Sequence, residues 1–470
     1  MTTILPKLFQ RGAALLVTLL LLPVPAHGFS IGEERLLGEK LLYAVRKNFA
    51  LIDDPDVSQY VNSLGRQVLK AAGPQYFDYH FFVVKNDQFN AFAAPSGLIF
   101  LNSGLVKTMK SEDQLVSVMA HEVGHVVSRH IASRMAKQSK VNALSLLFGA
   151  ASLAAGNPAL TQGLLTGALA AGATAGLSFS RQDEEQADRL AFDWMRSMDR
   201  DPAAMEETLK TMRRITRYHS EQQPPYLLTH PNPEDRLHYV QSLLEQEGRR
   251  MAAEKNDGGR FAFLRFKHRI LSESLDANEM RTWCSGTIAS GKNAEEVGMA
   301  RYGLALLSAK EMDFSGAIHQ MDQVRLDFPG REILDIDLAA IHLEAGQPAE
   351  ALKLLRPAHR QDPNDLYAAF HLARALEQTG DLAGAEKLHF ETARALPDYS
   401  KIYYELGRLK ARQGQNGSSI FYLGQHYLHE GRVELAKQHL RRAEKDQTIP
   451  SVLRQEAKFI LERLKQLEDA

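Results

Sequence analysis

The C-terminal part of this sequence repeats itself with a period of 34 residues. Three sets of residues show the period: Ala305, Ala339, Ala373 and Gly407; Gly346, Gly380 and Gly414; and Pro329, Pro363 and Pro397. Small residues let two antiparallel helices approach closely, glycine turns the chain between them, and proline ends the second helix. The pattern therefore predicts a stack of helical hairpins.

A period of 34 residues is that of tetratricopeptide repeats, which form a solenoid with a concave surface. After Gly414 the register slips by half a period, and residues 452–467 read as a final amphipathic helix that caps the array. Such surfaces bind peptides or partner proteins, so we favour partner binding over a spacer role. The repeats supply no catalytic group, so any chemistry must come from the residues before them.

The run from His121 to His125 reads His-Glu-Val-Gly-His. Ser111 and Gln114 form a capping-box start for a helix that carries this run. Residues four apart share a helix face, so both imidazoles can bind one cation while Glu122 holds the attacking water. The motif indicates zinc-dependent hydrolysis.

Because the motif is short enough to occur by chance, further ligands must decide its meaning. A structural zinc site has a closed shell of four ligands, usually with thiolates, but the chain has one cysteine, Cys284. An open, catalytic site fits better. His130 lies nine residues after His121, which places it on the opposite side of a continuous helix, so we predict a surface histidine.

A third ligand is available between Glu184 and Asp188. Ser180 and Asp183 read as another capping box, and Glu184 and Asp188 share one helix face at four-residue spacing. Glu184 can serve as a carboxylate ligand, while Asp188 can accept the ring N–H of a zinc-bound histidine and fix its orientation. Taken alone, such an acidic cluster is more often a solvated helix face.

These motifs resemble the HExxH and ExxxD pair of the M48 family of zinc metallopeptidases. Residues 90–105 resemble the strand-rich segment that those enzymes place before the metal helix. Residues 229–236 resemble their downstream His-Pro and Arg motif. The resemblance covers roughly residues 29–237, and several matches in order are far more specific than HExxH alone.

The resemblance implies one zinc ion per chain, with His121, His125 and Glu184 as ligands, Glu122 as the catalytic general base, and Asp188 as a supporting catalytic residue. Zinc lowers the pKa of a bound water to about 7. Glu122 would accept the water proton and pass it to the leaving amine. Together with the repeats, the resemblance implies unfolded or misassembled proteins as substrates. It also implies that the repeat domain binds the machinery that assembles outer-membrane β-barrels.

The sequence before the metal helix predicts a small sheet. Residues 79–84 and 97–101 read as strands, with Pro95 and Ser96 as turn residues between them. An edge strand beside the zinc could pair with an extended substrate backbone, with little sequence preference. We expect a mainly α fold: an α+β gluzincin-like metallopeptidase domain with a small sheet, followed by an α-helical tetratricopeptide-repeat solenoid.

His230 precedes Pro231 and Pro233, so it must lie in an extended or turning loop. As a fourth zinc ligand it would displace the water and keep the enzyme latent. Alternatively, it hydrogen-bonds the oxyanion of the transition state or orients the loop. Arg236 can orient the same site or form only a structural ion pair.

The first residues predict export. Lys7 and Arg11 precede an apolar run at 12–22, and residues 26–28 offer a small-residue cleavage site. The run is shorter than the roughly 20 residues of a membrane span, so we interpret residues 1–28 as a secretory signal peptide and expect a periplasmic protein. Without the two basic residues the net charge falls from -1 to -3, which leaves no basic excess for binding nucleic acid.

The expected domains are a signal peptide (1–28), a zinc metallopeptidase domain (29–255), a helical linker (256–298) and a tetratricopeptide-repeat domain (299–470). Residues 141–180 carry no charge and could form a buried hairpin, a lid or a peripheral membrane contact. We expect an exported zinc metalloendopeptidase that degrades misfolded or stalled envelope proteins and assists β-barrel assembly. Two alternatives are a periplasmic chaperone with a largely latent peptidase, and a membrane-embedded peptidase that inserts residues 141–180.

Overall fold

The computed structural model describes residues 30–136, 178–218, 225–247 and 257–468. The predicted signal peptide at 1–28 and most of the uncharged segment 141–180 lie outside these residues. None of the helices in the described ranges has both the length and the apolar character needed to span a bilayer.

The small sheet has three strands, β1 (His80–Val84), β2 (Ala91–Ala94) and β3 (Leu98–Asn102). Their order is β1-β3-β2, with β1 parallel and β2 antiparallel to the central β3. The mainly α fold with a small sheet is thus confirmed, and the predicted strands correspond to β1 and β3. The short β2 was not predicted, because its sequence Ala-Phe-Ala-Ala lacks the β-branched residues that favour strands.

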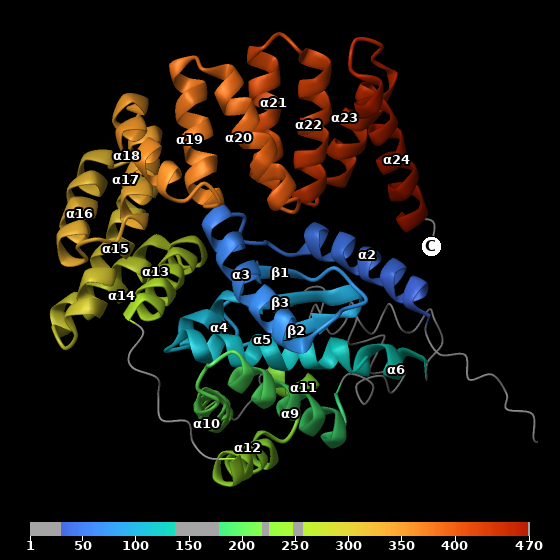
Figure 1. The fold of residues 1–470 in the computed structure, drawn as a ribbon, viewed down its shortest axis with the longest axis vertical. Helices are drawn as coiled ribbons and strands as arrows, with labels where there is room; N and C mark the ends of the chain where they lie inside the picture. Colours follow the sequence, from blue (N-terminus) through green and yellow to red (C-terminus); the bar gives the residue numbers. More distant parts are fainter. Residues whose placement is uncertain (1–29, 137–177, 219–224, 248–256, 469–470) are drawn as a thin grey trace, which may run out of the picture.

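Helices cover both faces of the sheet (Figure 1). Successive side chains of a strand point to opposite faces, so both faces carry apolar residues that helices bury. In β3, Phe100 joins a cluster with Leu41 and Val45 of α2 (Ile31–Asn48), while Ile99 and Leu101 point to the opposite face. On that opposite face lie α3 (Pro55–Ala72) and α5 (Glu112–Val127). The position of α5 therefore depends on the apolar residues of the sheet.

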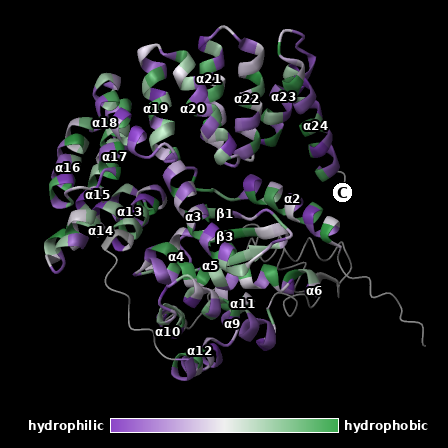
Figure 2. Ribbon diagram, viewed as in Figure 1, coloured by the Kyte–Doolittle hydropathy of each residue, from purple (hydrophilic) through white to green (hydrophobic). Residues whose placement is uncertain are grey.

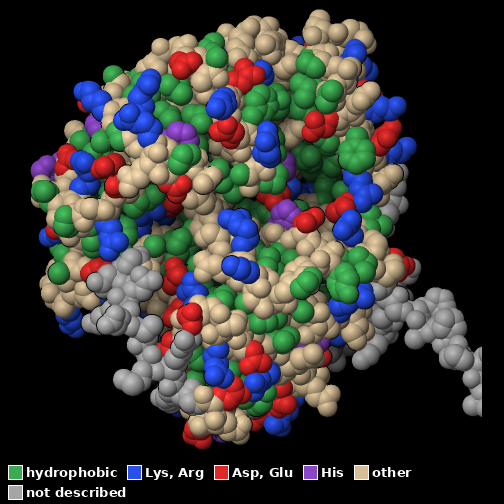
Figure 3. Space-filling view, in the orientation of Figure 1, with side chains coloured by type: hydrophobic (Ala, Val, Ile, Leu, Met, Phe, Trp, Pro, Cys, Tyr) green, Lys and Arg blue, Asp and Glu red, His purple; other side chains and the backbone are tan. Residues whose placement is uncertain are grey.

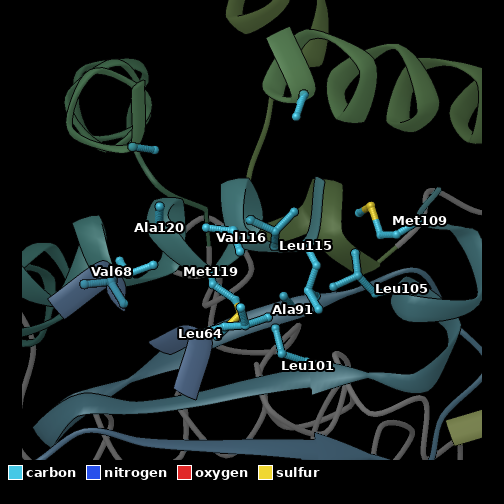
Figure 4. Close-up of a cluster of buried hydrophobic side chains, with 14 of the residues drawn as sticks. Leu64, Val68, Ala91, Leu101, Leu105, Met109, Leu115, Val116, Met119 and Ala120 are labelled. Atoms are coloured by element: carbon cyan, nitrogen blue, oxygen red, sulfur yellow. The ribbon is translucent and has the colours of Figure 1, made fainter. Parts of the chain in front are cut away.

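Figure 4 shows this core, with Leu64 and Val68 of α3, Leu101 of β3, and Leu115 and Met119 of α5 gathered together. In Figure 2 the sheet and α5 are largely hydrophobic, whereas α12 (Pro233–Glu247) is mostly hydrophilic. The remaining elements of this part of the chain are η1 (Pro95–Gly97), α4 (Ser103–Thr108), α6 (His130–Ala136), α9 (Arg181–Ser197), α10 (Ala203–Tyr218) and α11 (Pro225–Thr229).

Both helices that carry the predicted ligands begin at serine caps. The Ser111 side chain accepts the amide of Gln114 at the start of α5, while the Gln114 side chain accepts the amide of Lys110 rather than that of Ser111. At the start of α9, Ser180 and Asp183 form both hydrogen bonds of a capping box. These caps fix where each helix begins, and hence which residues face the site.

The rest of the chain is a solenoid of paired helices that arches over α2 and α3 (Figure 1). Its elements are α13 (Asp257–Ser274), α14 (Ala277–Ser290), α15 (Ala294–Lys310), α16 (Phe314–Asp327), α17 (Ile333–Glu344), α18 (Pro348–Gln361), α19 (Leu366–Thr379), α20 (Leu382–Ala395), α21 (Ser400–Arg412), α22 (Asn416–His429), α23 (Val433–Lys445) and α24 (Ser451–Glu468). The predicted turn glycines Gly346, Gly380 and Gly414 have positive φ angles of 72°, 98° and 75°. The tetratricopeptide-like solenoid is confirmed, and α24 matches the predicted final helix.

Candidate metal centre

Helix α5 places the two histidines of the HExxH motif side by side. The Nε2 atoms of His121 and His125 are 3.1 Å apart, and both side chains are buried. Their ring planes are nearly perpendicular, at 80°. The two residues lie one helical turn apart, and their ring nitrogens converge on one point. This is the arrangement expected of ligands that share an ion.

Helix α9 brings Glu184 to the same point. Its carboxylate oxygens lie 3.5 Å from Nε2 of His121 and 3.4 Å from Nε2 of His125. The two helices approach closely at Gly124, where a Cβ atom would lie only 3.2 Å from the Cα of Ala187. The glycine within the motif thus allows the distance between helices that the three side chains require.

His230 reaches this cluster from the connection between α11 and α12. Its Nδ1 lies 3.0 Å from Oε1 of Glu184 and 3.3 Å from Nε2 of His121, and its ring stacks on Tyr226 at 4.3 Å. Ligand atoms of His121, His125, Glu184 and His230 all lie within 4.8 Å of one another, and all four residues are buried. The structure therefore brings together the three predicted ligands and the possible fourth.

Glu122 lies beside the cluster and is fully buried. One of its carboxylate oxygens is 3.5 Å from Nε2 of His230. Neither oxygen has a hydrogen-bond partner among the described residues. A buried carboxylate without partners is costly, so these oxygens call for a proton donor such as water in the site.

Asp188 and Arg236 contact His121 and Glu184. Oδ1 of Asp188 lies 2.8 Å from Nδ1 of His121, and Arg236 donates to both oxygens of Asp188 at 2.7 and 2.8 Å. A further guanidinium nitrogen of Arg236 lies 2.9 Å from Oε2 of Glu184. Arg236 therefore links Glu184 to the carboxylate of Asp188, which contacts His121.

Electrostatics follow from this geometry. Burial raises the pKa of Asp188 and Glu184, but interactions with Arg236 and with the neighbouring imidazoles outweigh burial and hold both pKa values below their usual range. Burial and Arg236 lower the pKa of His121, yet Asp188 and Glu184 raise it to about 9. Burial keeps the pKa of His125 well below its usual value. Both carboxylates are thus ionised at neutral pH, as metal binding requires.

The donor set of two imidazoles and one carboxylate fits zinc with an open coordination position. Glu122, whose buried oxygens have no hydrogen-bond partner among the described residues, lies beside this donor set. A second group of potential ligands, Glu377, His389 and Glu405, lies in the solenoid. This group offers one histidine, whereas the first offers three histidines, two of them from the HExxH motif, so the first group is the better candidate for the metal.

The prediction for His130 was wrong, because its side chain is only 5% exposed. Helix α5 ends at Val127, Arg129 adopts a left-handed φ of 53°, and α6 begins at His130. This turn redirects the chain, so extrapolation along a continuous helix fails. His130 instead lies against His125, with 3.0 Å between their Nδ1 atoms.

Two aromatic contacts of the site were also not predicted. Phe179 stacks on His125 with 3.8 Å between ring centroids, and Tyr226 stacks on His230. Tyr226 of α11 lies four residues before His230, which directly follows that helix, so this helical spacing was the available signal. Phe179 is the second-last residue of the uncharged segment 141–180, and nothing in its sequence context indicates that it contacts a histidine of α5.

Comparison with known proteins agrees with this geometry. The profile of Peptidase family M48 matches residues 55–244, and that of a tetratricopeptide repeat matches residues 342–404. Beta-barrel assembly-enhancing protease of Escherichia coli (strain K12) is 32% identical over 358 residues, covering 69% of this chain and 73% of that protein. The chain belongs to peptidase family M48. It is therefore a zinc metalloprotease that also carries tetratricopeptide repeats.

Two further relatives of this M48 protease extend the comparison. Beta-barrel assembly-enhancing protease of Yersinia pestis is 30% identical over 389 residues, which cover 82% of this chain and 78% of that protein. A mitochondrial metalloendopeptidase of Schizosaccharomyces pombe is 27% identical over 187 residues, or 40% of this chain and 53% of its own. The likeness to the bacterial relatives thus extends across most of the chain, whereas the likeness to the mitochondrial one covers less than half.

Proposed function

We propose that this metalloprotease is an exported endopeptidase that cleaves unfolded or misassembled envelope proteins and assists the assembly of outer-membrane β-barrels. The observation that carries the peptidase assignment is the convergence of His121, His125 and Glu184 beside a partnerless Glu122. The envelope role is supported by the relatives named beta-barrel assembly-enhancing protease, which align over most of the chain.

The chemistry assigned to the site needs few groups. One zinc ion per chain, held by His121, His125 and Glu184, would acidify a bound water and polarise the scissile carbonyl. Glu122 takes the proton of that water and delivers it to the leaving amine. Asp188 keeps Nδ1 of His121 protonated, so that Nε2 is free to bind the metal.

An extended substrate backbone can lie along the sheet beside the site. β2 is an edge strand, and it contacts α5, the helix of the motif. Pairing with such an edge uses main-chain hydrogen bonds and imposes little sequence preference. This suits an enzyme whose substrates share an unfolded state rather than a sequence.

His230 supports latency of the peptidase. It is 1% exposed, and it lies against the predicted ligands Glu184 and His121 and the predicted base Glu122. As a fourth ligand it would displace the attacking water, and the loop that carries it would have to move before cleavage. The same position favours the second candidate function, a periplasmic assembly factor whose repeat domain acts while the peptidase is silent.

The deciding experiment is proteolysis of an unfolded β-barrel precursor by the purified protein, with wild type compared to Glu122→Gln at equal zinc occupancy. Cleavage by wild type alone supports the mechanism, because this change removes the base and spares every ligand. The His230→Ala variant, assayed in parallel, should cleave faster than wild type if His230 keeps the peptidase latent. Slower cleavage would mean that His230 assists the reaction and would contradict latency.

Location and partner need separate tests. Residues 1–28 fused to alkaline phosphatase should give enzyme activity in a bacterial host only if they direct export.

Crosslinking from surface positions of the solenoid to the outer-membrane assembly machinery tests the proposed partner, and capture that survives removal of residues 299–470 would contradict it. We assign no nucleic-acid partner. The peripheral membrane contact proposed for residues 141–180 is tested by deleting them and following membrane association.

A further inference from the structure

His130 connects one predicted zinc ligand to the helix that carries another. Its Nδ1 lies 3.0 Å from Nδ1 of His125. Its Nε2 lies 3.0 Å from Oε1 of Gln186 on α9. Neither His130 nor Gln186 is a defining residue of the HExxH or ExxxD motif, yet these contacts form a continuous line of hydrogen bonds that ends at the cluster.

The hydrogen-bond partners determine which ring nitrogens of His130 and His125 carry a hydrogen. The side-chain oxygen of Gln186 only accepts, so the hydrogen must be on Nε2 of His130. Oδ1 of Asp183, 3.6 Å from the same nitrogen, favours the same assignment. With that hydrogen on Nε2, Nδ1 of His130 offers its lone pair and accepts a hydrogen from Nδ1 of His125. Nε2 of His125, which lies 3.4 Å from Glu184, is left with the lone pair that binds a metal.

The surroundings hold His130 and His125 in place. His130 follows Arg129, whose guanidinium donates at 2.9 Å to Glu34, a buried carboxylate on α2. The ring of Phe179 stacks on His125 at an interplanar angle of 23°. The stacking restricts the tilt of the His125 ring, while the bond to His130 determines which of its nitrogens faces the cluster.

We propose that His130 is a positioning residue, which holds His125 in the tautomer that offers Nε2 to the zinc ion. Asp188 does the same for His121. The two ligands of one helix are thus oriented by different chemistry, a carboxylate for the first and a neutral imidazole relayed to Gln186 for the second. This inference rests on the proposed ligand role of His125, but not on whether the enzyme cleaves a particular substrate.

The test measures zinc affinity of the full-length protein by competition with a chromophoric chelator. His130→Leu should weaken zinc binding about 10- to 100-fold, the range found when an outer-shell partner of a ligand is lost. His130→Asn should stay within about 3-fold of wild type, because Oδ1 of asparagine occupies the place of the accepting nitrogen. A matched control, His371→Leu, removes another buried histidine far along the chain, on α19, and should leave the affinity unchanged.

Gln186→Leu provides a second arm. It should weaken zinc binding in the wild-type background by less than His130→Leu does, and have no effect once His130 is leucine. The absorption spectrum of the cobalt-substituted protein should change with His130→Leu and be restored with His130→Asn. A purely structural histidine predicts the opposite pattern: asparagine as harmful as leucine, or normal affinity for both. Either result overturns the proposal, and neither depends on cleavage, so failure of the peptidase assignment is seen separately.

Discussion

Arg236 determines the charge balance of the metal centre. It contacts Asp188 with two nitrogens and Glu184 with the third, and it is 5% exposed. Two carboxylates buried this close repel one another, and an unpaired buried charge is expensive. The guanidinium therefore makes it possible to bury both groups before any metal is bound.

Replacing Arg236 by glutamine should lower the free energy of unfolding of the metal-free protein by about 3–5 kcal/mol, the usual cost of breaking a buried ion pair. Zinc should recover part of this loss, because the ion itself neutralises Glu184. Urea titrations with and without zinc measure both effects. Arg213→Gln is the control: its pair with Glu234 is partly exposed, so the change should be within about 1 kcal/mol. Equal effects of the two substitutions would contradict this role of Arg236.

At the scale of elements, the site depends on how closely α5 and α9 pack. Gly124→Val should force the helices apart at Ala187, because even a Cβ atom at position 124 already lies 3.2–3.4 Å from that residue. Overpacking of this kind costs about 1–3 kcal/mol, and the separation should weaken zinc binding as well. Thermal unfolding and chelator competition test these effects. At Gly286 on α14 an added Cβ atom meets no atom within 4 Å, so Gly286→Val is the control and should leave zinc affinity unchanged.

The elements also show which parts of the site were predictable from sequence. His121, His125, Glu184 and Asp188 follow from helical spacing, which is a local property of α5 and α9. His130 does not, since one left-handed residue, Arg129, ends the periodicity on which the prediction depended. The contacts between α5, α9 and the connection before α12 join segments far apart in sequence, and spacing within a segment carries no information about them.

At the scale of the molecule, α13 joins the peptidase part to the solenoid. Arg265 donates to both oxygens of Asp337 on α17 at 2.6 and 2.7 Å, and to Asp56 on α3 at 2.8 Å. Arg269 donates to Asp337 and to Asp54, which caps α3. α3 also contacts α19, so the side of the solenoid that arches over it, predicted as a partner surface, is partly occupied by the protein's own α3 (Figure 1).

Asp337→Asn should uncouple this junction. It removes the charge that both arginines of α13 share, and it leaves them buried with a deficit of acceptors. We expect the free energy of unfolding to fall by about 3–5 kcal/mol, as for other broken buried pairs. Asp335→Asn on the same helix is the matched control, because its pair with Arg325 is about one-third exposed and worth little. A small effect at Asp337 would mean that apolar packing alone holds the two parts together.

A second junction closes the other end of the arch. Asp398, in the turn before α21, lies 2.5 Å from both Arg46 of α2 and His80 of β1. The junction borders a cavity of about 370 Å³ between the sheet and the solenoid, visible as a hollow in Figure 3. The hydrogen bond between His80 and Asp398 raises the pKa of His80. Burial raises the pKa of Asp398, but His80 and Arg46 outweigh burial and hold that pKa below its usual range.

These shifts predict how stability at this junction depends on pH. The raised pKa of His80 contributes stability that is complete below about pH 6.5 and lost as pH rises through its folded value. The lowered pKa of Asp398 contributes stability that is present above about pH 4 and lost as pH falls further. The difference in unfolding free energy between wild type and Asp398→Asn should therefore be largest between about pH 4 and pH 6.5 and shrink toward pH 9. Urea titrations across this range measure it, with Asp87→Asn, an exposed ion pair, as a control expected to differ little at any pH. A difference that grows with pH would show that His80 does not carry the charge that joins the sheet to the solenoid.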